Sequence, residues 1–295
     1  CQSCHFNKVW QEWQETTHAK SWSSSEFQKL AAKSPEGLEC GSCHASRPVI
    51  ITGLEKVPQI RETEREYGVG CVVCHLDSEG NMHGPEPTKR PSIHDYVIRP
   101  PEEAVKMCGT CHGTKNLESL CAVDNNPVNM EIALNNKLTC MQCHMPEVEK
   151  PRKRSWMSFK KVKDRKHIWL SHEPSVYREA VQLKVDVKQN SITVKAINQT
   201  SHSLPTEKDS KLKLILKVIG DNDVLVGSKQ SEYSKDSDTQ IKADKESSVS
   251  LEVEQPFGKV DAELWYIPSP ERKEIKEFLV TSKSISDCGF RRYAS

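Results

Sequence analysis

The chain has 295 residues, with 42 lysine and arginine residues against 41 aspartate and glutamate residues and a formal net charge of +1. This length allows one large domain or two ordinary ones. No apolar run reaches the roughly 18 residues that a membrane-spanning helix needs, and the near-neutral charge argues against a nucleic-acid-binding surface.

Cysteine and apolar residues are unevenly distributed along the chain. Eleven of the 12 cysteines lie in the first 143 residues, whereas only 40 of the first 160 residues, or 25%, are Val, Ile, Leu, Met, Phe, Trp or Tyr. That fraction is close to the composition at which a chain cannot bury enough apolar surface to fold unaided. We therefore expect a large apolar group to complete the core of this half.

Five CxxCH motifs, at residues 1–5, 40–44, 71–75, 108–112 and 140–144, account for ten of these cysteines. CxxCH is the attachment signature of c-type haem, in which two thiols form thioethers with the porphyrin and the histidine binds the iron. Zinc ribbons also use CxxC pairs, but zinc requires neither a histidine after every pair nor an odd number of pairs. A disulfide framework would leave the five histidines unexplained.

The motifs thus predict five covalently bound haem c groups. The expected attachment sites are Cys1, Cys4, Cys40, Cys43, Cys71, Cys74, Cys108, Cys111, Cys140 and Cys143. The expected axial ligands on the motif side are His5, His44, His75, His112 and His144.

Histidine on both faces of five irons would require ten histidines, and the chain has 11. The six outside the motifs are the candidate sixth ligands, with one in surplus: His18, His83, His94, His167, His172 and His202. Trp10, Trp13 and Thr17 precede His18 at helical spacing, which predicts one short helix there. Methionine is a less favoured ligand. Met145 directly follows His144 and cannot reach the opposite face of the same haem, and the other methionines are more simply explained as packing residues.

The sequence predicts a mixed fold with two domains. Residues 1–160 form a haem-organised domain of short helices and irregular segments, and residues 161–295 form an antiparallel, β-sandwich-like domain whose histidine-containing start reaches back to the haems. Residues 150–166 carry nine basic residues and one acidic residue, which fits either a solvated linker or neutralisation of haem propionates. Period-two alternation predicts strands at residues 181–187, 192–196, 212–218, 249–253 and 260–266.

Two cysteines, Cys121 and Cys288, remain outside the motifs. We expect a disulfide between them, with two free thiols as the alternative. Haem attachment to CxxCH is an extracytoplasmic reaction, so we expect a processed chain that is secreted to the extracellular space or cell surface, with the periplasm as the alternative.

These features resemble the secreted multihaem c-type cytochromes. The resemblance rests on the five CxxCH motifs, the tryptophan-containing segment before His18, the His83-Gly84-Pro85 turn and His167 ahead of the first strand. It extends to residues 202–206, His-Ser-Leu-Pro-Thr, which look like a Gly-His-x-x-Pro-Thr-Gly segment in that group, with Ser201 and Glu207 in place of the two glycines.

The resemblance implies electron transfer along closely packed bis-histidine haems, as in subunits of extracellular cytochrome filaments. The expected partners are other copies of the chain and redox donors and acceptors, with no nucleic acid and no membrane span. A soluble periplasmic carrier is one alternative. A multihaem reductase of a small nitrogen oxyanion or hydroxylamine is another, but pentahaem nitrite reductases replace one motif histidine by lysine, and all five motifs here end in histidine. We therefore expect no enzymatic activity.

Overall fold

The chain divides into two units, Cys1–Ser171 and His172–Ser295, which differ in secondary structure. The computed structural model describes residues 8–32, 37–84, 94–113, 128–135, 140–151, 161–169, 174–273 and 275–286. Four predicted features lie outside the described residues: the first motif, His172, Cys121 and Cys288. The predictions made for them remain predictions. No helix among the described residues is long and apolar enough to cross a membrane.

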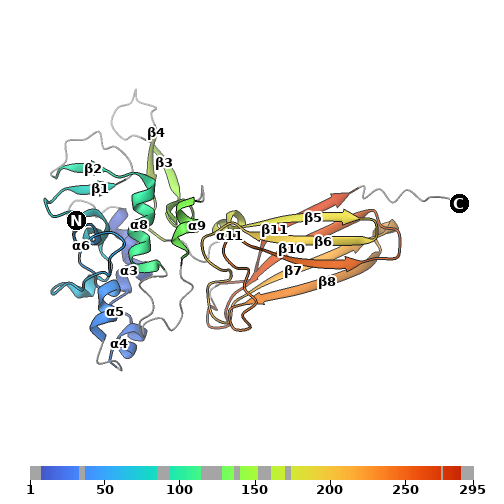
Figure 1. Ribbon diagram of the computed structural model, residues 1–295, viewed down its shortest axis with the longest axis horizontal. Helices are drawn as coiled ribbons and strands as arrows, with labels where there is room; N and C mark the ends of the chain where they lie inside the picture. The colour runs from blue at the N-terminus through green and yellow to red at the C-terminus, as the bar shows by residue number, and fades with distance from the viewer. Residues whose placement is uncertain are drawn as a thin grey trace. The chain divides into compact units, whose positions relative to one another are not determined.

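The first unit consists of short helices joined by loops (Figure 1). Its helices are α2 (Val9–Gln14), α3 (Thr17–Lys20), α4 (Ser25–Ala31), α5 (Gly37–His44), α6 (Val49–Thr52), η1 (Arg65–Tyr67), α7 (Cys71–His75), α8 (Pro101–His112), α9 (Met130–Asn135) and α10 (Cys140–His144). The longest, α8, begins with Pro101 and carries Glu102 and Glu103 in its first turn, which suits the free N–H groups and the positive end of the helix dipole.

The helix expected before His18 is in fact two helices. Helix α2 ends at Gln14, and the Thr16 hydroxyl accepts a hydrogen bond of 3.2 Å from the backbone N–H of Ala19, which caps α3. Threonine is a favourable N-cap residue, so a new helix starts here instead of continuing the first. His18 therefore lies in the second helix, apart from Trp10 and Trp13.

Two small sheets complete the first unit. Strands β1 (Met82–Gly84) and β2 (Tyr96–Ile98) are parallel, and β3 (Glu147–Pro151) and β4 (Lys161–Arg165) are antiparallel. Strand β4, which pairs with β3, and His167 both belong to the first compact unit.

The second unit contains two antiparallel sheets, one of four strands in the order β11-β10-β7-β8 and one of three in the order β5-β6-β9. Besides the short helices α11 (Pro174–Ala180) and η3 (Asp221–Asp223), its elements are β5 (Val181–Lys188), β6 (Ser191–Asn198), β7 (Lys211–Ile219), β8 (Leu225–Ser234), β9 (Glu246–Glu252), β10 (Lys259–Ile267) and β11 (Phe278–Ser286). This arrangement, together with the short helices of the first unit, confirms the predicted mixed fold class.

The large hydrophobic core of the described residues belongs entirely to the second unit. Alternate residues of β7 and β10 point into it; Leu212, Leu214 and Leu216 are fully buried. Tyr177 of α11 packs on Tyr266 with ring centroids 4.6 Å apart. The second unit is thus stabilised by its own apolar side chains, as the alternation predicts, whereas the first has no comparable core cluster among its described residues.

Candidate haem sites

All four described CxxCH motifs end a helix, and the motif histidine is the last helical residue each time. The helices are α5, α7, α8 and α10. Residues three apart in a helix lie on the same face, so the two cysteines of each motif are neighbours and the histidine follows at the helix end. This local geometry places two sulfurs and one imidazole where a single porphyrin can reach all three.

The thiols of different motifs also lie close together. A hydrogen bond from Cys111 lowers the pKa of Cys43 to about 7, and the same interaction raises the pKa of Cys111. Cys108 and Cys140 form a second such pair, and burial raises the pKa of Cys74 to about 11. Seven of the eight described motif cysteines carry a thiol that is not part of a disulfide, and thioether formation requires the thiol.

Cys40 differs from these seven cysteines because its sulfur is in a disulfide. Thioether formation at the second motif would need that sulfur as a thiol.

Backbone carbonyls orient the imidazoles of three candidate ligands. Nδ1 of His44 lies 2.9 Å from the carbonyl oxygen of Ser21, and Nδ1 of His75 lies 2.6 Å from that of His83. Nδ1 of His167 lies 3.1 Å from the carbonyl oxygen of Arg165. Donation from Nδ1–H leaves the lone pair on Nε2, and this is the usual hydrogen-bonding arrangement of a histidine that binds a metal.

His18 is a buried imidazole surrounded by other histidines. Burial, with smaller contributions from His112, His144 and His44, lowers the pKa of His18 to about 4. Its Nδ1 has no hydrogen-bond partner among the described residues. A neutral imidazole with an unshared buried nitrogen suits a group, such as a metallated porphyrin, that supplies the missing partner.

Two histidine pairs have the separation of two ligands on one metal ion. The ring centroids of His75 and His167 lie 6.2 Å apart, and those of His18 and His112 lie 6.0 Å apart. A metal–imidazole bond is about 2 Å and each ring centre lies about 1 Å behind its nitrogen, which gives a centroid separation of about 6 Å. The structure therefore brings the third and fourth motifs together with one non-motif histidine each.

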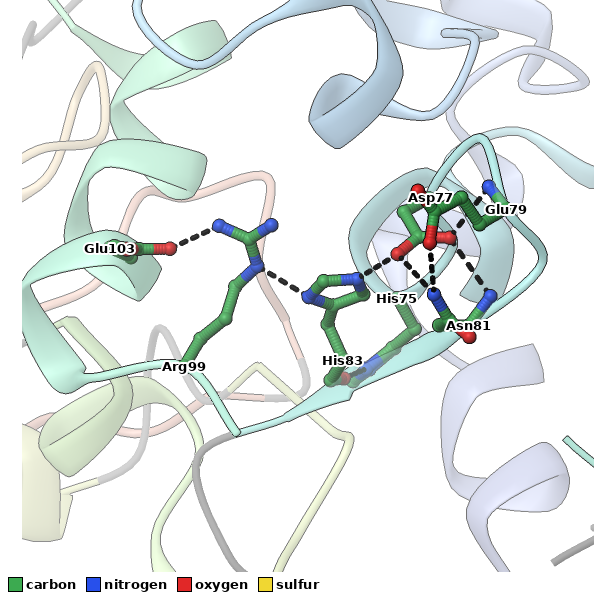
Figure 2. A network of polar contacts seen from close by, with 7 residues as sticks. All are labelled: His75, Asp77, Glu79, Asn81, His83, Arg99 and Glu103. Atoms are coloured by element: carbon green, nitrogen blue, oxygen red, sulfur yellow. Dashed lines mark hydrogen bonds and ion pairs between the residues drawn. The ribbon is translucent and has the colours of Figure 1, made fainter. Parts of the chain in front are cut away.

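His83 lies beside His75 but directs its imidazole elsewhere, as Figure 2 shows. Its Nε2 lies 2.7 Å from Oδ2 of Asp77, and its Nδ1 accepts a 2.5 Å hydrogen bond from Nε of Arg99. Arg99 also pairs with Glu103. Both ring nitrogens of His83 are thus engaged, the side chain is only 5% exposed, and the residue reaches His75 through its carbonyl oxygen.

Asp77 is held in place by a turn that follows the third motif. Its carboxylate accepts hydrogen bonds from the backbone N–H groups of Glu79 and Asn81 and from the side-chain amide of Asn81. These bonds, and first of all the one from His83, hold the pKa of Asp77 well below its usual range. An ionised Asp77 therefore fixes the tautomer of His83 with the proton on Nε2. Sequence reasoning missed Asp77 and Arg99, because single charged residues near a motif carry no distinguishing pattern.

The other predicted ligands lie in different settings. His144 ends α10 and is close enough to His18 to lower its pKa. His94 is half-buried just before β2. His202 lies in the second unit, in a loop after β6. His5 and His172 lie outside the described residues.

The loop around His202 is fixed by Asn198 and Thr200. The Asn198 side-chain amide donates to the carbonyls of His202 at 2.8 Å and of Ile241 at 2.9 Å, and the Thr200 hydroxyl also donates to His202. Asn198 is fully buried, so the Asn198-Gln199-Thr200 segment has a structural role in the folded chain. Glu207, which stands where the resembling segment has glycine, pairs with Arg272 at 2.7 Å.

The chain is similar to known proteins in part of its sequence and in its fold. Residues 1–76, which contain the first three motifs, match the family model described as "Cytochrome c554 and c-prime". A penta-haem cytochrome c552 from Thermochromatium tepidum shares the fold over 97% of each chain, with a TM-score of 0.54 and 16% identity. A superoxide reductase from Nanoarchaeum equitans is only weakly similar, with a TM-score of 0.26 and 9% identity over 37% of this chain and 94% of that one. No curated protein matches significantly. The family match thus covers the segment with the first three motifs, and the structural match shows a shared fold.

Proposed function

We propose that the chain is a multihaem c-type cytochrome that transfers electrons along five covalently bound haem c groups, each held by two histidines. The observation that carries this proposal is the separation of the two histidine pairs, His75 with His167 and His18 with His112, at 6.2 and 6.0 Å. Five CxxCH motifs supply the attachment sites. Haem iron supplies reversible one-electron redox chemistry when it is bound.

In this proposal, histidines of the chain would hold both axial positions of each haem and leave none for a substrate. Carbonyl groups fix the imidazoles of His75 and His167, so neither ligand has to move when the charge on the centre changes. Such preorganised polar groups lower the reorganisation that accompanies charge transfer. This arrangement favours rapid electron exchange over catalysis.

The histidine count then assigns the remaining ligands. With His167 and His18 used, the other three motifs, which end in His5, His44 and His144, have four candidates left. Because Asp77 and Arg99 engage both ring nitrogens of His83, we assign the surplus to His83. His94, His172 and His202 are then the candidates that remain for these three motifs.

Intact-mass spectrometry with in-gel haem staining tests the cofactor content. The proposal expects the mass of the polypeptide plus five haems, retained under denaturing conditions because the thioethers are covalent. Reversible one-electron waves in protein-film voltammetry are expected for the same sample. A stable protein with metal but no porphyrin would contradict the proposal.

We further propose that the chain acts outside the cytoplasm, as a subunit of an extracellular filament in which haems of successive copies meet. The resemblance to filament cytochromes supports this role, and so does a β unit in which we find no catalytic constellation among the described residues. Electron microscopy of the natively secreted protein tests it. Ordered filaments are expected, whereas discrete particles at every concentration would leave a soluble periplasmic carrier. We also propose that Cys121 and Cys288 form a disulfide.

A multihaem reductase of nitrite or hydroxylamine is the alternative from another class. It would need one iron with an open position, and all five motifs end in histidine. Carbon monoxide binding to the reduced protein separates the two functions, because it requires an open or readily vacated position. We expect no stoichiometric carbon monoxide complex.

A further inference from the structure

Trp169 contacts one ligand of each histidine pair. Its ring centroid lies 4.8 Å from that of His18 and 5.8 Å from that of His167, with interplanar angles of 75° and 82°. Both contacts have the edge-to-face geometry that aromatic rings prefer. Together with the pairs themselves, these contacts form a continuous ring series, in the order His112, His18, Trp169, His167 and His75.

The backbone of Trp169 is strained. Its φ angle is 42°, in the left-handed region, where a bulky side chain is a rare outlier. Strain of this kind persists only where the surrounding structure fixes the residue, and it concentrates at functional sites. The ring contacts and the backbone conformation are independent observations, and both single out Trp169.

Hydrogen bonds to two other elements fix the segment that carries Trp169. The backbone N–H of His167 donates to Oε2 of Glu12 in α2 at 2.9 Å. The Arg165 guanidinium donates to the carbonyl of Met145 at 3.1 Å and to the carboxylate of Glu147 at 2.9 Å. These bonds leave the chain little freedom to relax the φ angle of Trp169.

We propose that Trp169 is a positioning residue shared by His18 and His167, and that it couples the two centres they serve. This inference rests on the proposed axial pairs. The edge-to-face contacts fix the rotation of both imidazoles and keep the space between them filled. One electron leaves one centre and arrives at the other, while the indole is neither oxidised nor reduced and no proton or bond changes.

Two substitutions separate the ring from the strained backbone. Trp169→Gly removes the indole and also suits a φ of 42°, whereas Trp169→Phe keeps an aromatic ring at the same strained position. Trp265→Phe in β10 is the matched control for loss of an indole, because Trp265 belongs to the second unit. All variants are made in the full-length haem-loaded protein, with haem content confirmed by intact mass.

The readouts are the low-spin ferric EPR g-values, which depend on the angle between axial imidazole planes, and the rate of electron equilibration after pulsed reduction. We expect Trp169→Gly to shift the g-values of two centres and to slow equilibration about tenfold or more, as small misplacements of reacting groups do. Trp169→Phe should stay close to the wild type, and Trp265→Phe should match it.

The outcomes distinguish this inference from the proposed function. Unchanged g-values and rates in a fully loaded Trp169→Gly variant would overturn the role of Trp169 and leave the electron-transfer function standing. A haem-free wild type would overturn both. If Trp169→Gly fails to load haem, NOEs in the reduced wild type between the indole and the imidazole protons of both His18 and His167 support the inference, and their absence overturns it.

Discussion

His75 and His167 face each other across a centroid distance of 6.2 Å, and a carbonyl group orients each ring through its Nδ1 atom. His75 is the last residue of helix α7, and His167 follows strand β4. Two distant segments therefore meet with their imidazoles at the separation that one iron requires.

Replacing His167 by alanine should open one iron and leave the other four unchanged. The oxidised variant is expected to show one high-spin ferric centre per chain, and the reduced variant should bind one equivalent of carbon monoxide. EPR spin quantitation and carbon monoxide difference spectra measure the two effects. His18→Ala should behave in the same way.

The matched control is His83→Ala, which removes the histidine that we assign as surplus. Because its ring nitrogens serve Asp77 and Arg99, the variant should keep every iron low-spin. A high-spin centre in His83→Ala and none in His167→Ala would reverse the ligand assignment.

Asp77→Ala should raise the reduction potential of the third-motif haem. Loss of this carboxylate frees the His83 ring and loosens the 2.6 Å contact between the His83 carbonyl and Nδ1 of His75. A weaker hydrogen bond makes the His75 imidazole a poorer donor, which favours ferrous iron by on the order of tens of millivolts. Glu79→Gln changes only a side chain that contacts Asn81 and does not touch His83. It should leave the potential unchanged in a spectroelectrochemical titration. A shift in both variants would indicate a general charge effect.

Asn198→Ala should destabilise the second unit by about 1–3 kcal/mol, because it leaves buried carbonyls without a donor. The affected carbonyls belong to His202, Ile241 and Lys242. Denaturant unfolding followed by circular dichroism measures the loss. Thr193→Ala, which removes an exposed hydroxyl contact on β6, is the control and should cost much less. Equal losses in the two variants would argue against a structural role for Asn198.

Stability of the second unit should fall at alkaline pH through Tyr177. Burial, and next the neighbouring Tyr266, raise the pKa of Tyr177 well above its ordinary value. The folded state thus favours the neutral phenol, so its stabilising contribution is complete below the unfolded pKa of about 10 and is lost as pH rises above it. Thermal melts between pH 8 and 11 should show a smaller decline for Tyr177→Phe than for the wild type. Parallel declines would contradict the assignment.

The sheet unit was largely predictable because its strands alternate strictly. Leu212, Leu214 and Leu216 alternate with lysine or isoleucine, and the alternate residues are buried in β7. Strands β8 and β11 escaped prediction because burial does not alternate from residue to residue along them, and most of their side chains are exposed or half-buried. Their sequences therefore lack the period of two that marks the other strands.

The candidate attachment residues could be predicted from the motifs, but the pairing of the histidines could not. CxxCH is a local pattern, whereas the contact of His75 with His167 depends on how α7 and the segment after β4 meet. Trp169 carried no local signal either, because its significance comes from two ring contacts and a backbone angle. Tertiary contacts of this kind leave no periodicity in the sequence.

Bis-histidine ligation of all five haems is tested most directly by low-temperature EPR of the fully oxidised wild-type protein, with the spins quantified against the chain concentration. Bis-histidine ligation throughout predicts five low-spin ferric centres per chain and no stoichiometric high-spin signal, in agreement with five CxxCH motifs. One high-spin iron per chain would contradict bis-histidine ligation throughout and indicate an open, enzyme-like site.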